Sequence, residues 1–121
     1  MSVEGIVAEL VPLVADHARL HRDVVMEKGR GPKPVAEARQ LAMALVFVRL
    51  SKMTAKDTSV RALVQLVGEA FERDESTVRH AIDAVNQRCR EDAGLEAFFS
   101  AHAAPPRKPR KKRAKLNGVA A

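Results

Sequence analysis

The feature that most constrains the fold is a helical repeat of apolar residues late in the chain. Ala81, Ile82, Val85 and Cys89 follow Val78 by three, four, seven and eleven residues, which places all five on one face of an α-helix. Other apolar residues recur with this period earlier in the chain, and no segment shows the alternation expected of a strand. The sequence therefore predicts an all-α fold, a compact multi-helix domain whose amphipathic helices share one core.

Gly, Pro and polar residues divide this helical pattern into segments. The first apolar stripe runs from Val3 to Val25, and Pro12 within it is expected to kink the helix or to begin a second one. The stretch KGRGPKP, residues 28–34, contains two Gly and two Pro and is predicted to be a loop. Further helices are expected at 36–50, 58–71, 75–90 and 95–99, with Asp57, Thr58 or Ser59 as N-cap before 58–71 and Asp74 as N-cap before 75–90.

The composition favours one domain with an aliphatic core. Of 121 residues, 46% are hydrophobic but only 3% are aromatic, so Leu, Val, Ala and Met must fill the core, with Leu95, Phe98 and Phe99 covering it. The single cysteine, Cys89, excludes an internal disulfide and is expected to be a small buried residue. We expect residues 1–103 to form the domain, with a helix-turn-helix at about 58–90, and residues 104–121 to form a disordered basic tail.

The positive charge is concentrated in this tail. The formal net charge is +6, and seven of the 21 basic residues follow the last acid, Glu96. Removing these seven from 21 leaves 14 cations against 15 acids, so the preceding residues sum to −1. The seven are Arg107, Lys108, Arg110, Lys111, Lys112, Arg113 and Lys115. We expect them to bind phosphates without regard to sequence, while RNA, an anionic membrane surface or an acidic protein are the alternatives for such a tail.

Other functional classes find little support in the sequence. The opening MSVEGIVAELVPLVADH lacks the basic region of a secretory signal, and the longest apolar run, 41–48, is shorter than the roughly 20 residues of a membrane span. No GxSxG or GxxxxGK[ST] motif is present. His17 and His21 have the spacing of a metal-ligand pair, but no HExxH motif or third ligand accompanies them. We expect a cytoplasmic, nucleoid-associated protein that is not an enzyme and has no metal, cofactor or membrane partner.

The segments 58–71 and 75–90 are joined by about three residues, which is typical of a helix-turn-helix. The second segment opens with RDESTVRHA, residues 73–81, where acids and hydroxyls are followed by a cation. Such residues at a helix start either cap the helix or contact base edges, and spacing alone leaves both readings open.

Two stretches resemble the C-terminal DNA-binding domain of the bacterial replication initiator DnaA. ARQLAMAL, residues 38–45, is similar to that family's Arg-Gln-hydrophobic-Ala helix. GEAFERDESTVRHA, residues 68–81, is similar to its signature, which runs from Gly-x-Ala-Phe through Arg-Asp-His-Ser/Thr-Thr-Val to His-Ala. The likeness covers 38–99, but the connection between the two stretches is longer than in the family, and Glu75 stands where the family has a base-reading His. The resemblance implies a stand-alone DnaA-like or Trp-repressor-like domain without the ATPase that melts origins.

The resemblance also implies which residues contact DNA. The expected major-groove set is Asp74, Glu75, Ser76, Thr77 and Ala81. The expected phosphate contacts are Arg39, Gln40, Arg73, Arg79 and His80. By position, Arg30 and then Lys33 of the basic loop enter a minor groove, although a solvated turn is the alternative for that loop. Since a carboxylate accepts from cytosine N4, Glu75 is expected to move the preference toward a C·G pair.

Together these features predict a sequence-specific double-stranded DNA-binding protein, most simply a bacterial transcription regulator. Helix 75–90 would read the major groove and loop 28–34 the minor groove, and a homodimer or partner protein would extend the short site that one module reads. One alternative is a protein-interaction module that binds RNA polymerase, a replication factor or another regulatory protein, with non-specific nucleic-acid affinity from its tail. Another is a nucleoid-type DNA-coating protein.

Overall fold

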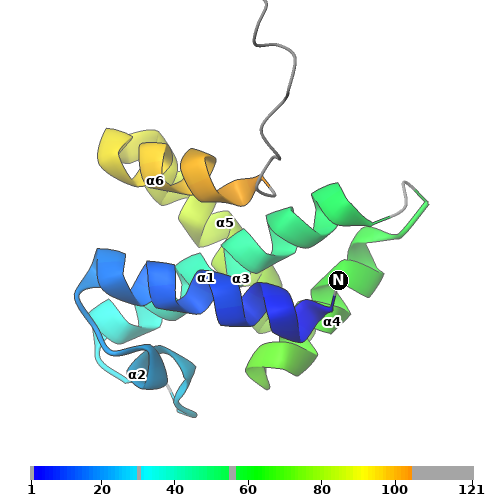
Figure 1. The fold of residues 1–121 in the computed structure, drawn as a ribbon, viewed down its shortest axis with the longest axis horizontal. Helices are drawn as coiled ribbons and strands as arrows, with labels where there is room; N and C mark the ends of the chain where they lie inside the picture. Colours follow the sequence, from blue (N-terminus) through cyan, green and yellow to red (C-terminus); the bar gives the residue numbers. More distant parts are fainter. Residues whose placement is uncertain (1, 30, 55–56, 105–121) are drawn as a thin grey trace, which may run out of the picture.

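A central helix surrounded by apolar side chains organises the structure. The computed structural model describes residues 2–29, 31–54 and 57–104, which form six α-helices and no strand (Figure 1). The helices are α1 (Val3–Ala18), α2 (Arg22–Met26), α3 (Lys33–Met53), α4 (Val60–Phe71), α5 (Glu75–Glu91) and α6 (Ala93–Ala103). α3 contacts each of the other five, because apolar residues face outward on all its sides through its middle turns. The predicted all-α fold is confirmed.

The first apolar stripe forms two helices, divided later than Pro12. α1 continues through Pro12 to Ala18, and Arg19 then adopts a left-handed conformation with φ 61°. The N–H of Arg19 donates to the Asp16 carbonyl and the next N–H to the Ala15 carbonyl, which closes the helix end. The prediction that Pro12 begins a second helix is wrong. The apolar face on both sides of the proline is fully buried, which offsets the hydrogen bond that it cannot make.

The basic loop is shorter than predicted. α3 begins at Lys33, with Pro32 at its N-cap and Pro34 in its first turn, where a missing N–H costs little. Lys33 and Pro34 therefore belong to the helix, and the prediction that they lie in a loop is wrong. Arg30 lies outside the described residues.

α4 and α5 form a tight corner, as the sequence predicted. Ser59 caps α4 by accepting from the Ala62 N–H at 3.1 Å, so it is the N-cap among the three candidates. Glu72 ends α4 in a left-handed conformation with φ 57°. A Cβ atom on Gly68 would lie 2.6 Å from the Arg73 carbonyl oxygen, so the close approach of the chain at this corner requires glycine.

α6 covers the far end of the core and is longer than predicted. Leu95, Phe98 and Phe99 are half-buried and pack against the core, as expected. A buried arginine of α3 fastens its end: Arg49 donates from Nη2 to the His102 carbonyl at 2.8 Å and from Nη1 to Glu9 of α1 at 3.1 Å. In Figure 1, α6 and α2 lie on opposite sides of α1.

Candidate nucleic-acid interface

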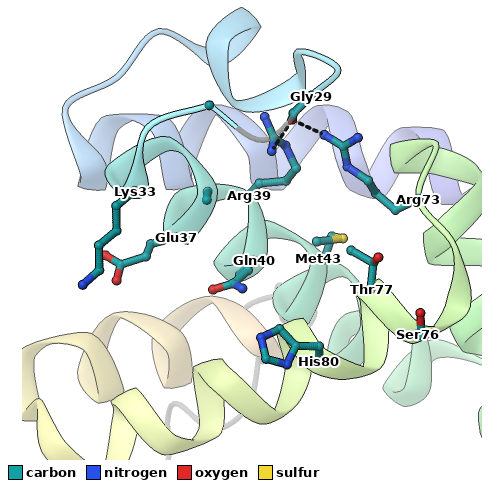
Figure 2. Close-up of a pocket in the computed structure, with 12 residues that line it drawn as sticks. Gly29, Lys33, Glu37, Arg39, Gln40, Met43, Arg73, Ser76, Thr77 and His80 are labelled. Atoms are coloured by element: carbon teal, nitrogen blue, oxygen red, sulfur yellow. Dashed lines mark hydrogen bonds between the residues drawn. The ribbon is translucent and has the colours of Figure 1, made fainter.

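A hollow of about 830 Å³ lies between the start of α3, the loop before it and the start of α5. Figure 2 shows the loop and the two arginines on one side and the α5 side chains on the other. Its polar lining includes many residues that the sequence singled out: Lys33, Arg39, Gln40, Arg73, Ser76, Thr77 and His80. These residues are spread over 48 positions of the chain, from 33 to 80, and the fold brings them to one concave surface.

Two arginines fasten the loop before α3. Arg39 donates from Nε to the Val25 carbonyl at 2.9 Å, from Nη2 to that of Glu27 at 2.9 Å, and from Nη1 to that of Gly29 at 3.0 Å. Arg73, from the corner between α4 and α5, donates to the same carbonyls of Glu27 and Gly29, at 3.1 and 3.0 Å (Figure 2). The loop and the corner are therefore held in a fixed relation.

Arg39 differs from its predicted role. Its side chain is only 5% exposed, and its donors face loop carbonyls, so it is not a side chain that reaches outward to a phosphate. Burial lowers the pKa of Arg39, and the neighbouring Arg73 guanidinium lowers it further. Two like charges kept this close raise the positive potential of the wall on which they lie. Arg39 thus holds the loop and adds charge to the hollow.

The cations lining the hollow exceed its acids. Among the described lining residues, Lys33, Arg39 and Arg73 give three positive charges against one acid, Glu37, a balance of +2 with His80 counted as neutral. Glu37 also forms an ion pair with Arg88 of α5, 3.7 Å between Nη1 and Oε1. The hollow therefore suits an anion, although the residues before the tail have a net charge of −1.

Arg88 is a residue that the sequence analysis missed. Its Nη2 donates to the Gln40 side-chain oxygen at 3.1 Å, which fixes Gln40 at the edge of the hollow. Because Arg88 occupies the Gln40 side-chain oxygen, the Gln40 amide nitrogen remains to donate to an anion in the hollow. His80, one α5 turn beyond Thr77, is exposed and lines the same wall.

Asp74 caps α5 through one oxygen of its carboxylate. Its Oδ1 accepts from the Thr77 N–H at 2.9 Å and from the Ser76 hydroxyl at 3.0 Å. Hydrogen bonds from Thr77 and Ser76 lower the pKa of Asp74. Ser76 and Thr77 themselves are exposed, so the predicted major-groove set now consists mainly of hydroxyls. Asp74 is therefore the N-cap of α5, and base contact stays a prediction for Ser76 and Thr77.

Glu75 turns toward α4. Its Oε2 accepts from Gln65 Nε2 at 2.9 Å, and its Oε1 lies 3.7 Å from Arg61 Nε. Arg61 and Gln65 were not identified from the sequence, since nothing in their own spacing separates them from other polar residues of a solvated helix face. Glu75 does not line the hollow but stands beside it.

The remaining predicted contacts divide between surface and core. Arg79 is exposed, with no hydrogen bond or ion pair to the described part of the chain. Ala81 has no exposed surface and lies in the core beside Val78 and Val85 of the same helix. The prediction that Ala81 contacts a base is therefore wrong, because its side chain offers nothing to a partner. The tail cations lie beyond residue 104, outside the described residues.

The histidines of the first helices have structural roles. His21 caps α2 by accepting from the Asp23 N–H at 3.1 Å, and His17 stacks on Phe98 with ring centroids 4.1 Å apart. Within the described ranges no group of three His, Cys, Asp or Glu side chains could hold a metal ion, and no helix has the length and apolar character to cross a membrane.

No protein-family model matches the chain, and no curated protein is similar enough to match it. The hollow and the first turn of α5 are therefore the features of this chain that indicate a function.

Proposed function

We propose that this protein binds double-stranded DNA in a sequence-specific manner and acts as a bacterial transcription regulator. One observation carries the proposal: a hollow with an excess of positive charge adjoins the exposed, hydroxyl-bearing first turn of a helix. Cationic side chains bind backbone phosphates, and short polar side chains at the start of a helix contact base edges. In this structure the cations of the hollow lie next to the hydroxyls of the first turn of α5.

In the proposed complex the first turn of α5 enters the major groove. Ser76 and Thr77 are exposed and adapt to donors or acceptors on base edges. Phosphates of one strand lie along the hollow, where Lys33, Arg73 and His80 meet them and the fixed charge of Arg39 lies behind. Arg79, exposed on α5, faces the phosphates across the groove. The likeness of 38–45 and 68–81 to the DnaA-type DNA-binding domain supports this arrangement.

The basic loop and the tail complete the proposed contact. Because Lys33 belongs to α3 and lines the hollow, we assign it to the phosphates, and Arg30 remains the proposed minor-groove residue. The seven tail cations of 107–115 add affinity that does not depend on sequence and keep the protein on the nucleoid. A site of few base pairs requires a second copy or a partner protein for useful specificity.

Charge-removal variants of the full chain test this proposal. Lys33→Gln is expected to lower the slope of log affinity against log salt by about one, because one phosphate contact is lost. Lys52→Gln is the matched control, since Lys52 is an exposed lysine at the opposite end of the same helix. A chain with the seven tail cations changed to Gln is expected to bind duplex DNA more weakly and to keep its sequence preference. Equal effects of the Lys33 and Lys52 changes, or loss of all preference without the tail charges, would contradict the proposal.

A protein partner is the second candidate, favoured by apolar surface away from the hollow. Met53 at the end of α3 and Val60 at the start of α4 are exposed near the junction of the two helices. RNA polymerase, another regulatory protein or a second copy of the chain are the proposed partners for this surface. A chain that binds DNA only through its tail, without sequence preference, would make protein interaction the primary function.

A further inference from the structure

The ion pair between α4 and α5 lies beside the residues that the proposed function assigns to the major groove. Glu75 is the first residue of α5, and Ser76, directly after it, is exposed. Arg61 and Gln65 are four residues apart and so share one face of α4. Both reach the Glu75 carboxylate, Gln65 Nε2 at 2.9 Å from Oε2 and Arg61 Nε at 3.7 Å from Oε1. The contact therefore joins the first two turns of α4 to the first residue of α5.

This contact leaves the donor end of Arg61 open to a ligand. The Arg61 side chain is 74% exposed, whereas that of Glu75 is 36% exposed. Only Nε of Arg61 faces the carboxylate, and within the described residues its two terminal nitrogens have no hydrogen-bond partner. An exposed ion pair of this kind contributes little to the stability of the fold, so stability alone does not explain why these two residues are paired. Its effect is to restrict the orientation of a long cationic side chain.

We propose that Arg61 is a specificity-determining DNA contact that donates to a guanine, and that Glu75 and Gln65 position it. The inference rests on the proposed function. Arginine donates two hydrogen bonds in a fixed fork, which matches the O6 and N7 acceptors of guanine in the major groove. The Glu75 carboxylate, 3.7 Å from Nε, favours orientations of that fork beside the first turn of α5 and so reduces the entropy lost on binding. Neutralisation by Arg61 also removes the repulsion that an isolated Glu75 would exert on phosphates.

This assignment changes the role expected of Glu75. A direct cytosine contact needs a carboxylate that points into the groove, but Oε2 of Glu75 accepts from Gln65 and Oε1 lies 3.7 Å from Arg61 Nε, so the carboxylate faces α4. Glu75 therefore acts through Arg61 and is a positioning residue. The G·C preference of the site comes from the guanine side of the pair, and it depends on a residue of α4.

The test is selection of duplexes from a random library by the full chain, with R61A, E75Q and R90A variants in parallel. Arg90 is a matched control because it is an exposed arginine near the far end of α5. The wild-type chain is expected to select a guanine and to bind its site about tenfold or more tightly than a site with that guanine replaced. R61A is expected to bind both sites alike. E75Q is expected to reduce the discrimination, while its affinity for the replaced site is at least that of wild type because a negative charge has been removed. R90A is expected to discriminate as wild type does.

Three results would overturn the inference while leaving the proposed function in place. Uniform weakening of all duplexes by R61A would make Arg61 a phosphate contact. Loss of discrimination in E75Q but not in R61A would assign direct base reading to Glu75. If R61A and R90A behave alike, the effect of R61A comes from the loss of one positive charge and not from a specific base contact. A wild-type chain that selects no sequence would instead overturn the proposed function, and the inference with it. Thermal unfolding of each variant checks that the fold is retained.

Discussion

Arg39 and Arg73 hold the same loop carbonyls, and this redundancy predicts a strong non-additive effect on stability. Arg39→Met removes the hydrogen bonds to the carbonyls of Val25, Glu27 and Gly29, but Arg73 still donates to the last two. Of these three described carbonyls, that of Val25 is the one left without a replacement donor, at a cost of about 1–3 kcal/mol for an unsatisfied buried group. Arg73→Met leaves every Arg39 bond in place, so its cost is about 1 kcal/mol or less.

The double variant should destabilise more than the sum of the two single variants. In it the carbonyls of Glu27 and Gly29 lose both donors, which adds a coupling energy of about 1–2 kcal/mol. Urea unfolding followed by far-UV circular dichroism measures all four free energies, and comparison of m-values checks that the transition stays two-state. Strict additivity, or a larger loss from Arg73→Met than from Arg39→Met, would refute the shared-clamp explanation.

Three other changes test the local structure. Asp74→Ala should lower the thermal unfolding temperature at pH 7 by loss of the α5 cap. Because the folded-state pKa of Asp74 is lowered, the wild-type advantage is present above the unfolded pKa of about 4 and disappears as pH falls through the folded value, so an equal gap at pH 7 and pH 2 would contradict it. Gly68→Ala should cost about 1–3 kcal/mol in urea unfolding, because its Cβ meets the Arg73 carbonyl; an unchanged midpoint would exclude that clash. Arg49→Met should cost about 1–3 kcal/mol, chiefly because the His102 carbonyl at the end of α6 loses its donor while the half-exposed Glu9 can turn to solvent; a neutral result would show that this contact does not stabilise the end of α6.

The helices were predictable where the signal was local. The period of the apolar residues fixed the core face of α5, and an acid before it marked the N-cap at Asp74. The same period already placed Ala81 on the core face, so its assignment to the major groove followed the family resemblance against the pattern in the chain. The resemblance also grouped Gln40, Arg73 and His80, which do meet at the hollow.

The burial of two arginines of α3 could not be predicted from the polarity of arginine alone. Arg39 was expected to contact a phosphate and Arg49 was not singled out, yet they are 5% and 2% exposed. The sequence does carry a signal: Ala42 and Val46 continue from Arg39 to Arg49 in steps of three, four and three, so both arginines occupy core-facing positions of α3. An arginine within such a stripe is expected to bond carbonyls of neighbouring segments.

The contacts of Glu75 depended on information that no single helix contains. Its partners Arg61 and Gln65 are set by the crossing of α4 and α5 and by the three-residue turn between them. Helix periodicity gives the face on which each residue lies but not the angle at which two faces meet. The end of the first helix at Arg19, a non-glycine residue in a left-handed conformation, was equally hidden.

The most direct test of the account is to map the backbone amide resonances of the full chain during titration with duplex DNA. If the hollow and the start of α5 form the interface, the largest shifts fall at Lys33 to Met43 and at Arg73 to His80, and they remain when the seven tail cations are replaced by Gln. Shifts confined to residues beyond 104, lost when those cations are replaced, would contradict the claim that the folded domain binds DNA.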